Sequence, residues 1–287
     1  MMDEKAENAE CRISNDELGA GAPHSSCDVH DSSLRLPSPV RIGGFPVRPL
    51  TRGQLISVLV QRACQGPRTS VHYLNTYTFA LARRDAALGR VLAGSDLLYA
   101  DGMSVVWAGR LLGRAITERL SAADYFEGFC RRCARRGVAL FLLGGQKGAA
   151  AAAAAHLCRR VPGLAIAGTH HGYFHDAASH EVVRRINASG ARVLLAGMGS
   201  PRQELWLDRH AAELAPPVRW SVGALFDYFA GRERRAPAWM CRCGGEWFYR
   251  LLHRPRERWR RYLLANAAFA AAVLGELWAG DWLKAES

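Results

Sequence analysis

The segments VALFLLGG (138–145) and RVLLAGMG (192–199) are continuously apolar and then end in glycine. A strand that is apolar on both faces is typical of a parallel sheet with helices on both sides, because neither face meets water. Ligands bind such sheets at the carboxyl ends of the strands, which is where these glycines stand. The two segments therefore predict an α/β fold with a ligand site beside their final glycines.

Outward from these segments, strands alternate with helices over 54–229. The expected strands are 70–75, 96–102, 138–145, 164–170, 192–199 and one that begins at 219. The expected helices are 54–64, 76–92, 103–113, 122–136, 147–160, about 178–189, and 201–214. This alternation predicts a Rossmann-like, mostly parallel sheet with flanking helices. No GxGxxG motif opens the first unit and no GxxxxGK[ST] motif occurs, which argues against a dinucleotide oxidoreductase and a P-loop NTPase.

Composition divides the 287 residues into three parts. Residues 1–38 are polar and acidic and are expected to be a disordered tail. Residues 39–231 form the predicted α/β core, and 232–287 form a basic helical appendage. The formal net charge is +12, and 232–262 alone hold ten arginines against three glutamates. Such an uneven charge indicates a polyanionic partner, either a membrane surface, a nucleic acid or a phosphate-rich substrate.

Nothing in the sequence calls for a metal or another cofactor. Cys130 and Cys133 form a CxxC in a helical context with no second pair at zinc spacing, so we expect free thiols of a cytosolic protein. His170 and His171 are adjacent on an expected strand and would face opposite sides, which disfavours a shared metal. No DxD pair is present. No secretory leader is apparent, and the apolar run at 263–274 is too short to span a bilayer alone.

Glycine recurs just after several of the expected strands, at 102, 144–145, 172, 197 and 199. Glycine there lets a ligand approach backbone N–H groups, and a following helix N-terminus favours phosphate. Strand-to-helix turns also need glycine for their own geometry. Three such turns together nevertheless favour a site for a phosphorylated ligand.

Seven blocks, in this order, resemble the WecG/TagA/CpsF glycosyltransferase family (glycosyltransferase family 26). They are YADGMSVVWAGRLLG, ERLSAADYF, FLLGGQKG, VPGLAIAGTHHGYF, INASGARVLLAGMGSPRQELW, SVGALFDYFAGRERRAP and GEWFYRLLHRPRERWRRYL. The resemblance covers about 45–265. The most specific parts are GRxxRAP (231–237), EWxYR (246–250) and RYL (261–263).

The resemblance implies an inverting transfer of a sugar from a UDP-sugar to a polyprenyl-diphosphate-linked acceptor at the cytoplasmic face of the membrane. N-acetylmannosamine, its uronic acid and glucuronic acid are the donor sugars that it suggests, and the products feed bacterial surface glycans. Two positions depart from the family pattern and bear on the choice of sugar: Tyr73, where many members have threonine, and Ala122, where many have glycine.

Asp101 is the expected catalytic base. It follows an apolar strand at the ligand-binding edge, where a carboxylate can take the proton of an attacking hydroxyl. The aspartate of the DG motif also has this role in the proposals made for the family. The alternative is that Asp101 caps the helix that begins near Met103.

The resemblance also implies a set of substrate-binding positions: Asn75, Arg119, Gln203, Glu204, Asp227, Gly144, Gly145 and Gly199. Asn75 would bind sugar or phosphate, or serve only as a turn residue. Arg119 would neutralise the leaving diphosphate, or simply be solvated. Gln203 would contact the donor, while Glu204 would orient the site or favour the helix dipole. Asp227 would bind the uracil ring, or hold the sheet edge.

The basic C-terminal stretch interleaves arginine with Trp and Tyr, which suits an anionic membrane surface. The resemblance implies that its arginines hold the lipid diphosphate, with Arg250, Arg256 and Arg260 as the candidates. The apolar segment 263–278 is either an interfacial helix or a contact in a homo-oligomer. The runner-up function is a basic nucleic-acid-binding protein with a Rossmann-like core, and a non-catalytic scaffold ranks below it. We expect no nucleic-acid partner.

Overall fold

The computed structural model describes residues 35–233, 236–242, 244–253 and 255–285, and the chain from Leu36 onward forms one compact unit. The predicted tail lies outside the described residues up to residue 34. Some side chains of the C-terminal helices lie outside the description too, among them those of Arg250, Arg256 and Arg260.

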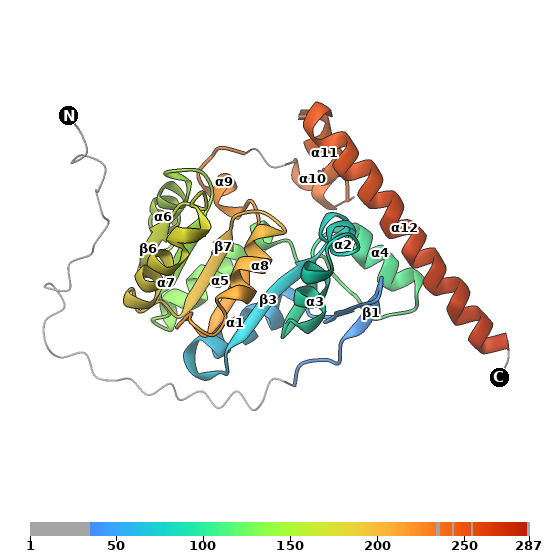
Figure 1. Ribbon diagram of the computed structural model, residues 1–287, viewed down its shortest axis with the longest axis horizontal. Coiled ribbons are helices and arrows are strands. Elements are labelled where there is room, and N and C mark those ends of the chain that lie inside the picture. The colour runs from blue at the N-terminus through green and yellow to red at the C-terminus, as the bar shows by residue number, and fades with distance from the viewer. Residues whose placement is uncertain (1–34, 234–235, 243, 254, 286–287) are drawn as a thin grey trace, which may run out of the picture. The chain divides into compact units, whose positions relative to one another are not determined.

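A six-stranded sheet forms the centre of this unit, and every pair of neighbouring strands is parallel (Figure 1). The strands lie in the order β4-β3-β8-β7-β5-β6. Their bounds are β3 Thr69–Leu74, β4 Leu97–Ala100, β5 Leu140–Gly144, β6 Ile166–His170, β7 Val193–Gly197 and β8 Val218–Ser221. The predicted parallel α/β sheet is therefore confirmed. A short antiparallel hairpin, β1 Val40–Ile42 and β2 Phe45–Val47, precedes it and was not predicted.

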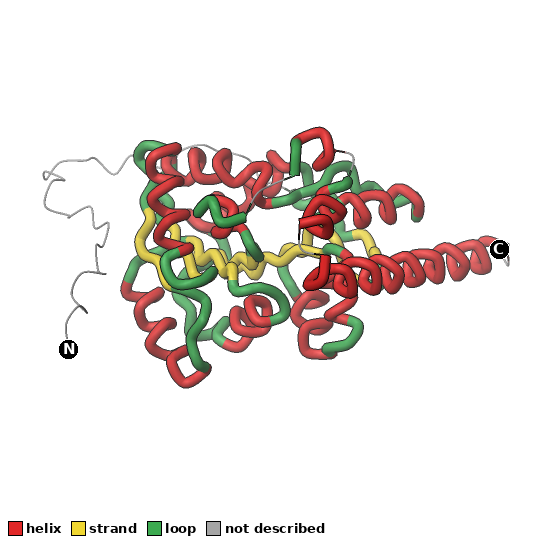
Figure 2. Tube along the Cα trace, turned by 90° about the horizontal axis from the view of Figure 1, so that it is seen from above, coloured by secondary structure: helices red, strands yellow, loops and turns green. Residues whose placement is uncertain are grey.

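Helices cover both faces of the sheet, as Figure 2 shows with the strands seen edge-on. Side chains of α1, α5, α6 and α9 pack on one face, and those of α2, α3, α4, α7, α8 and α12 pack on the other. The helices of the core are α1 Arg52–Gln65, α2 Thr76–Ala82, α3 Ala86–Gly94, α4 Met103–Leu111, α5 Ala122–Arg135, α6 Ala149–Arg160, α7 Ser179–Ala188 (after the short 3₁₀ helix η2 Asp176–Ala178), α8 Arg202–Arg209 and α9 Leu225–Phe229. The C-terminal helices are α10 Ala238–Arg242, α11 Glu246–His253 and α12 Pro255–Ala285.

Two predicted helices differ from the observed ones. The helix expected over 76–92 is two helices, because Asp85 interrupts it. The Asp85 carboxylate accepts from the backbone N–H groups of Ala87 and Leu88 at 2.9 and 3.2 Å and so caps α3. The helix expected over 201–214 ends at Arg209.

The two faces of the sheet are packed differently. One face carries a single continuous apolar cluster. The other carries two separate clusters, and four polar side chains of the central strands β3 and β8 stand between them: Ser70, His72, Arg219 and Ser221. Ser70 lies opposite Arg219 in the β3–β8 register, so these alternating positions share one face. We call these four residues the polar seam.

Helix α12 packs on the core through one face, beside α2 (Figure 1). The ring of Phe269 lies edge-on to that of Phe79, with 5.1 Å between the ring centres. Further along the helix, Glu276 accepts from the backbone N–H of Gly44 at 2.7 Å and from Arg114 Nη1 at 2.6 Å. The segment 263–278 is thus partly buried against the protein's own core. Its other side exposes apolar side chains, at Leu263, Leu264, Leu274 and Trp278. Across the described residues, no helix has the length and apolar character needed to cross a membrane.

Candidate active site

Asn75 and Asp101 follow the neighbouring strands β3 and β4 and meet at the carboxyl edge of the sheet. The Asn75 carboxamide oxygen accepts from the backbone N–H groups of Tyr77 and Thr78 at 3.0 and 2.9 Å, which caps α2. Its Nδ2 donates to Oδ2 of Asp101 at 3.3 Å. Asn75 is therefore a turn residue, which was the alternative to its binding of sugar or phosphate. It also orients the Asp101 carboxylate.

Asp101 is not the N-cap of the helix that follows it. Its backbone N–H donates to the Leu74 carbonyl at 2.9 Å and so extends the β-ladder by one residue. The N-cap of α4 is Gly102, with a φ of 118° that favours glycine and no side-chain cap. The Asp101 carboxylate lies instead among the side chains that line a cleft beside the two strand ends.

Arg119 is the third predicted residue in this cleft, and it is held by two carboxylates. Its guanidinium lies 2.5 Å from Oδ2 of Asp124 and 2.7 Å from Oε2 of Glu246. The side chains of Arg119 and Glu246 are each only 11% exposed. Burial lowers the pKa of Arg119, but the two carboxylates outweigh it and hold the pKa above its ordinary value. The alternative to the predicted diphosphate role, a solvated arginine, is therefore wrong, and the diphosphate role stays a prediction.

The cleft has a volume of about 120 Å³ and is closed on one side by residues of the C-terminal region. These residues are Gly244, Glu246, Trp247 and Asn266. Sites for whole drug-sized ligands usually have at least about 300 Å³, so the cleft as it stands accommodates only part of a nucleotide sugar. None of the four residues was predicted as a site residue. Glu246 begins the EWxYR block that carried the resemblance, yet the sequence pointed to Arg250 within it.

Gly144 is the last residue of β5 and Gly145 begins the turn after it, and the backbone requires glycine at both positions. A Cβ on Gly144 would lie 2.4 Å from the carbonyl oxygen of Gly197 on β7, which neighbours β5 in the sheet. Gly145 has a φ of 67°, and its N–H donates to the same carbonyl at 3.0 Å. Gly199 has a φ of 81° but has open space where a Cβ would stand. Packing therefore explains the glycine at 144, whereas at 199 the positive φ, and not packing, favours glycine.

Asp227 lies near this turn, on the first turn of α9. Its Oδ1 is 3.7 Å from the position that a Cβ on Gly145 would take. Partial burial, helped by Glu233, raises the pKa of Asp227 against the opposite effect of Arg232. Asp227 and Gly145 therefore lie close together at the end of β5.

Gln203 and Glu204 are fully buried beneath the strand ends. The Gln203 amide donates to Oε1 of Glu204 at 2.7 Å and to the hydroxyl of Tyr73 at 3.2 Å, and its oxygen accepts from the Gly223 N–H at 3.2 Å. Burial raises the pKa of Glu204 against the effect of its hydrogen bonds, and its Oε2 has no hydrogen-bond partner. These contacts are all internal, so direct binding of a donor by Gln203 remains a prediction. Tyr73, which departs from the family pattern, belongs to the same internal network.

The structure therefore divides the predicted residues into two groups along one edge of the sheet. Asn75, Asp101 and Arg119 share the cleft, whereas Gly145 and Asp227 lie together near the end of β5. Arg250, Arg256 and Arg260 lie outside the described side chains.

The expectation that His170 and His171 face opposite sides is wrong: their rings stack with centres 4.5 Å apart, because β6 ends at His170. The described residues contain no group of three or more His, Cys, Asp or Glu side chains arranged to hold a metal ion.

The sheet and the helices on its two faces define an α/β protein of the parallel-sheet class, and the cleft lies at the edge of the sheet where such proteins bind substrates. A model of the glycosyl transferase WecG/TagA/CpsF family matches residues 40–281, and the chain belongs to this family. It is thus a glycosyltransferase, and its family acts in the synthesis of cell-surface polysaccharides. Family membership favours this function over the nucleic-acid-binding alternative.

Proposed function

We propose that the protein is an inverting glycosyltransferase that moves a sugar from a UDP-sugar to a polyprenyl-diphosphate-linked glycan. The donor sugar is of the N-acetylmannosamine, N-acetylmannosaminuronic acid or glucuronic acid type. The observation that carries the proposal is the meeting of Asp101, Asn75 and Arg119 in one cleft at the carboxyl edge of the sheet. These three residues come from separate segments of the chain and are among those that the family resemblance places in the pocket.

Asp101 acts as the general base in this proposal. The acceptor hydroxyl gives its proton to the Asp101 carboxylate while its oxygen bonds to the anomeric carbon. The bond from that carbon to the diphosphate oxygen breaks on the opposite side, so UDP leaves and the configuration inverts. The hydrogen bond from Asn75 Nδ2 to Asp101 Oδ2 fixes the orientation of the base.

The charges in the cleft suggest which part of the carboxyl edge of the sheet binds the donor and which part binds the acceptor. Two carboxylates, those of Asp101 and Glu246, line the cleft with one guanidinium, and Asp124 holds that guanidinium from behind. This surplus of negative charge suits a neutral hydroxyl acceptor better than a diphosphate. We therefore assign the UDP portion to the open glycine edge beside Asp227 and Gly199. Arg119 binds the diphosphate only if its guanidinium gives up the ion pair with Asp124 or with Glu246.

The lipid part of the acceptor belongs to the C-terminal region in this proposal. Arg250, Arg256 and Arg260 bind its diphosphate, and the Arg- and Trp-rich stretch rests on the anionic inner face of the cytoplasmic membrane. The exposed Leu263, Leu264 and Trp278 lie on α12, whose first turns belong to that stretch. They supply apolar side chains for such a surface, and the enzyme is accordingly a peripheral one.

The test is UDP release from a panel of UDP-sugars, with and without a polyprenyl-diphosphate-linked acceptor. We expect release with one donor that requires the acceptor. Asp101→Asn should lower turnover by about 10²-fold or more and leave UDP affinity largely unchanged. Asp176→Asn, at an exposed carboxylate distant in sequence from the cleft residues, is the matched control and should retain turnover. Undiminished turnover in Asp101→Asn would rule out its role as the base. Acceptor-independent hydrolysis alone would rule out the transfer.

A further inference from the structure

A second cavity lies at the opposite, amino end of the central strands, between α3 and α8. Its volume is about 300 Å³, and its floor is formed by members of the polar seam, Ser70, His72 and Arg219. Ser70 and Arg219 stand at or near the starts of β3 and β8, whereas the cleft of Asp101 follows the carboxyl ends of β3 and β4. The two sites are therefore separated by the length of a strand.

Arg219 is an unusual residue for the centre of a sheet. It is 7% exposed, and its neighbour on β7 in the same register is the fully buried Leu194. Burying a charge is unfavourable unless a counter-charge and hydrogen bonds compensate it. The hydrogen bond that Arg219 forms is one from Nη1 to the carbonyl of Ala211, at 2.5 Å. No carboxylate among the described residues lies within ion-pair distance of its guanidinium.

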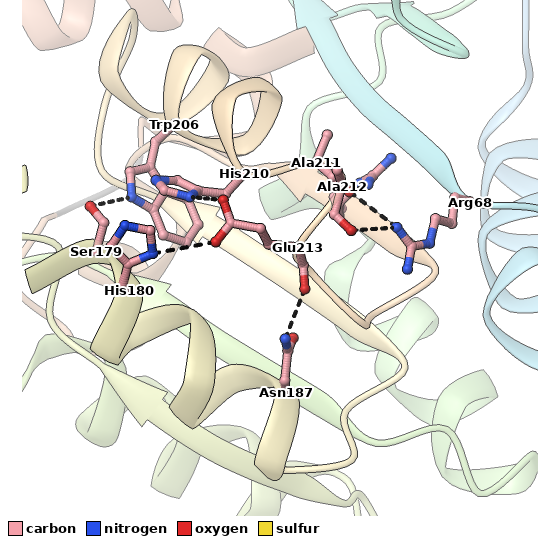
Figure 3. Close-up of polar contacts among 10 residues, drawn as sticks. Arg68, Ser179, His180, Asn187, Trp206, His210, Ala211, Ala212 and Glu213 are labelled. Carbon is pink, nitrogen blue, oxygen red and sulfur yellow. Dashed lines mark hydrogen bonds and ion pairs between the residues drawn. The ribbon is translucent and has the colours of Figure 1, made fainter.

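A second guanidinium meets the same carbonyl. Arg68 donates to the Ala211 and Ala212 carbonyls at 3.3 and 3.0 Å, as Figure 3 shows. The turn after α8 is thus held by two arginines that repel each other. Burial lowers the pKa of Arg219, and Arg68 lowers it further against the weaker pull of Asp96 and Asp208.

The cavity also has an apolar wall and a second cationic side chain. Val91 of α3 and Leu205 and Leu207 of α8 form the wall, and the exposed Arg90 stands on the lining as well. Asp208 is the one carboxylate among the lining residues, and it is exposed. The Ser70 hydroxyl already donates to Oδ2 of Asp96 at 2.8 Å. The cavity therefore offers two guanidinium groups next to an apolar surface.

We propose that this cavity is a second ligand site, which binds a small oxyanion, phosphate or carboxylate, attached to a short apolar body. The oxyanion pairs with Arg219 and Arg90, and the apolar body lies against Val91 and Leu205. A guanidinium binds both kinds of oxyanion through paired N–H groups. The ligand supplies the counter-charge that Arg219 lacks within ion-pair distance among the described residues. A volume of about 300 Å³ is at the lower end for small-molecule sites, which limits the body to the size of a single ring.

The test is a titration of the full chain with phenyl phosphate and with benzoate, in the presence of saturating UDP, by calorimetry. Phenol is the uncharged control. We expect binding of at least one of the two anions and none of phenol, and the tighter anion identifies the head group. The titration is repeated without UDP. An anion that binds only when UDP is absent would be bound at the nucleotide site, and this would overturn the proposal.

Variants locate the binding. Arg219→Gln should weaken it at least about tenfold, the usual effect of losing a hydrogen bond to a charged group. Because a change at a buried arginine can impair folding, Ala87→Phe provides the second variant: it fills the cavity from α3 and keeps both arginines. Arg84→Gln removes an exposed arginine that does not line the cavity, and it should bind as the wild type does.

Three results would overturn the inference: no anion binding by the wild type, unchanged binding in Ala87→Phe, or equal weakening in Arg84→Gln and Arg219→Gln. None of these measurements depends on sugar transfer. A failure of the second site is therefore distinguishable from a failure of the proposed glycosyl transfer.

Discussion

Replacing Phe269 with alanine measures how firmly α12 is held on the core. Phe269 is 4% exposed, and its ring packs edge-on against Phe79 with 5.1 Å between the ring centres. Truncating a buried phenylalanine to alanine costs about 3–5 kcal/mol, because apolar contacts are lost and a cavity remains. We expect Phe269→Ala to lower the free energy of unfolding by about that amount.

The assay is urea denaturation followed by tryptophan fluorescence and circular dichroism, with a thermal melt beside it. For a chain of this size a loss of about 3–5 kcal/mol corresponds to a fall in Tm of about 10 °C. Leu274→Ala is the matched control, since Leu274 lies on the same helix but is 52% exposed. It should change stability by no more than about 0.5 kcal/mol. If Phe269→Ala proves as mild as Leu274→Ala, α12 is not part of the core and the reasoning is refuted.

Three further predictions concern the sites. Glu246→Gln should lower stability by about 1–3 kcal/mol in urea denaturation, because Arg119 keeps only one of its two carboxylates; an unchanged midpoint would show that the pair is not formed. Gly145→Ala should cost about 1–3 kcal/mol by the same measurement, because φ is 67° and the added Cβ would lie 2.7 Å from that of Ala149; a neutral effect would contradict the turn geometry. Burial, reinforced by Arg219, lowers the pKa of His72 to about 4. As the pH falls, His72 is protonated near pH 6.5 in the unfolded chain but only near pH 4 in the folded chain. About 3 kcal/mol of stability is therefore present above pH 6.5 and is lost as the pH falls to 4. In His72→Asn the free energy of unfolding should depend less on pH in this range. A pH profile parallel to that of the wild type would show that His72 is not responsible for the loss.

Much of the fold was predictable because its strands are buried on both faces. The segments 138–145 and 192–199 predicted β5 and β7 within two residues at each end, because a short, continuously apolar run is typical of a strand that is buried on both faces. The break between α2 and α3 was not predicted, because the apolar pattern continues across Asp85 while its carboxylate caps a new helix. The β1–β2 hairpin was missed because its two strands have only three residues each.

The cleft was predictable only in part, for a related reason. Asn75 and Asp101 each follow a strand, and neighbouring parallel strands bring such residues together without further information. One of the two partners of Arg119, Glu246, was not predictable, because it comes from a helix 127 residues later in the chain. Gln203 and Glu204 stood out in the sequence as polar residues of a specific motif. Whether such residues face a ligand or an internal network depends on burial, which a motif does not encode.

The polar seam also separates the packing on one face of the sheet into two independent parts. Leu98 belongs to the apolar cluster on one side of the seam and Leu194 to the cluster on the other. Side chains that share no neighbours have additive effects on stability, whereas side chains within one cluster are coupled. Each cluster is therefore free to change its residues over evolution without compensation by the other. On the opposite face, where Val71, Trp220 and Phe126 share one cluster, a change at one position calls for adjustment at the next.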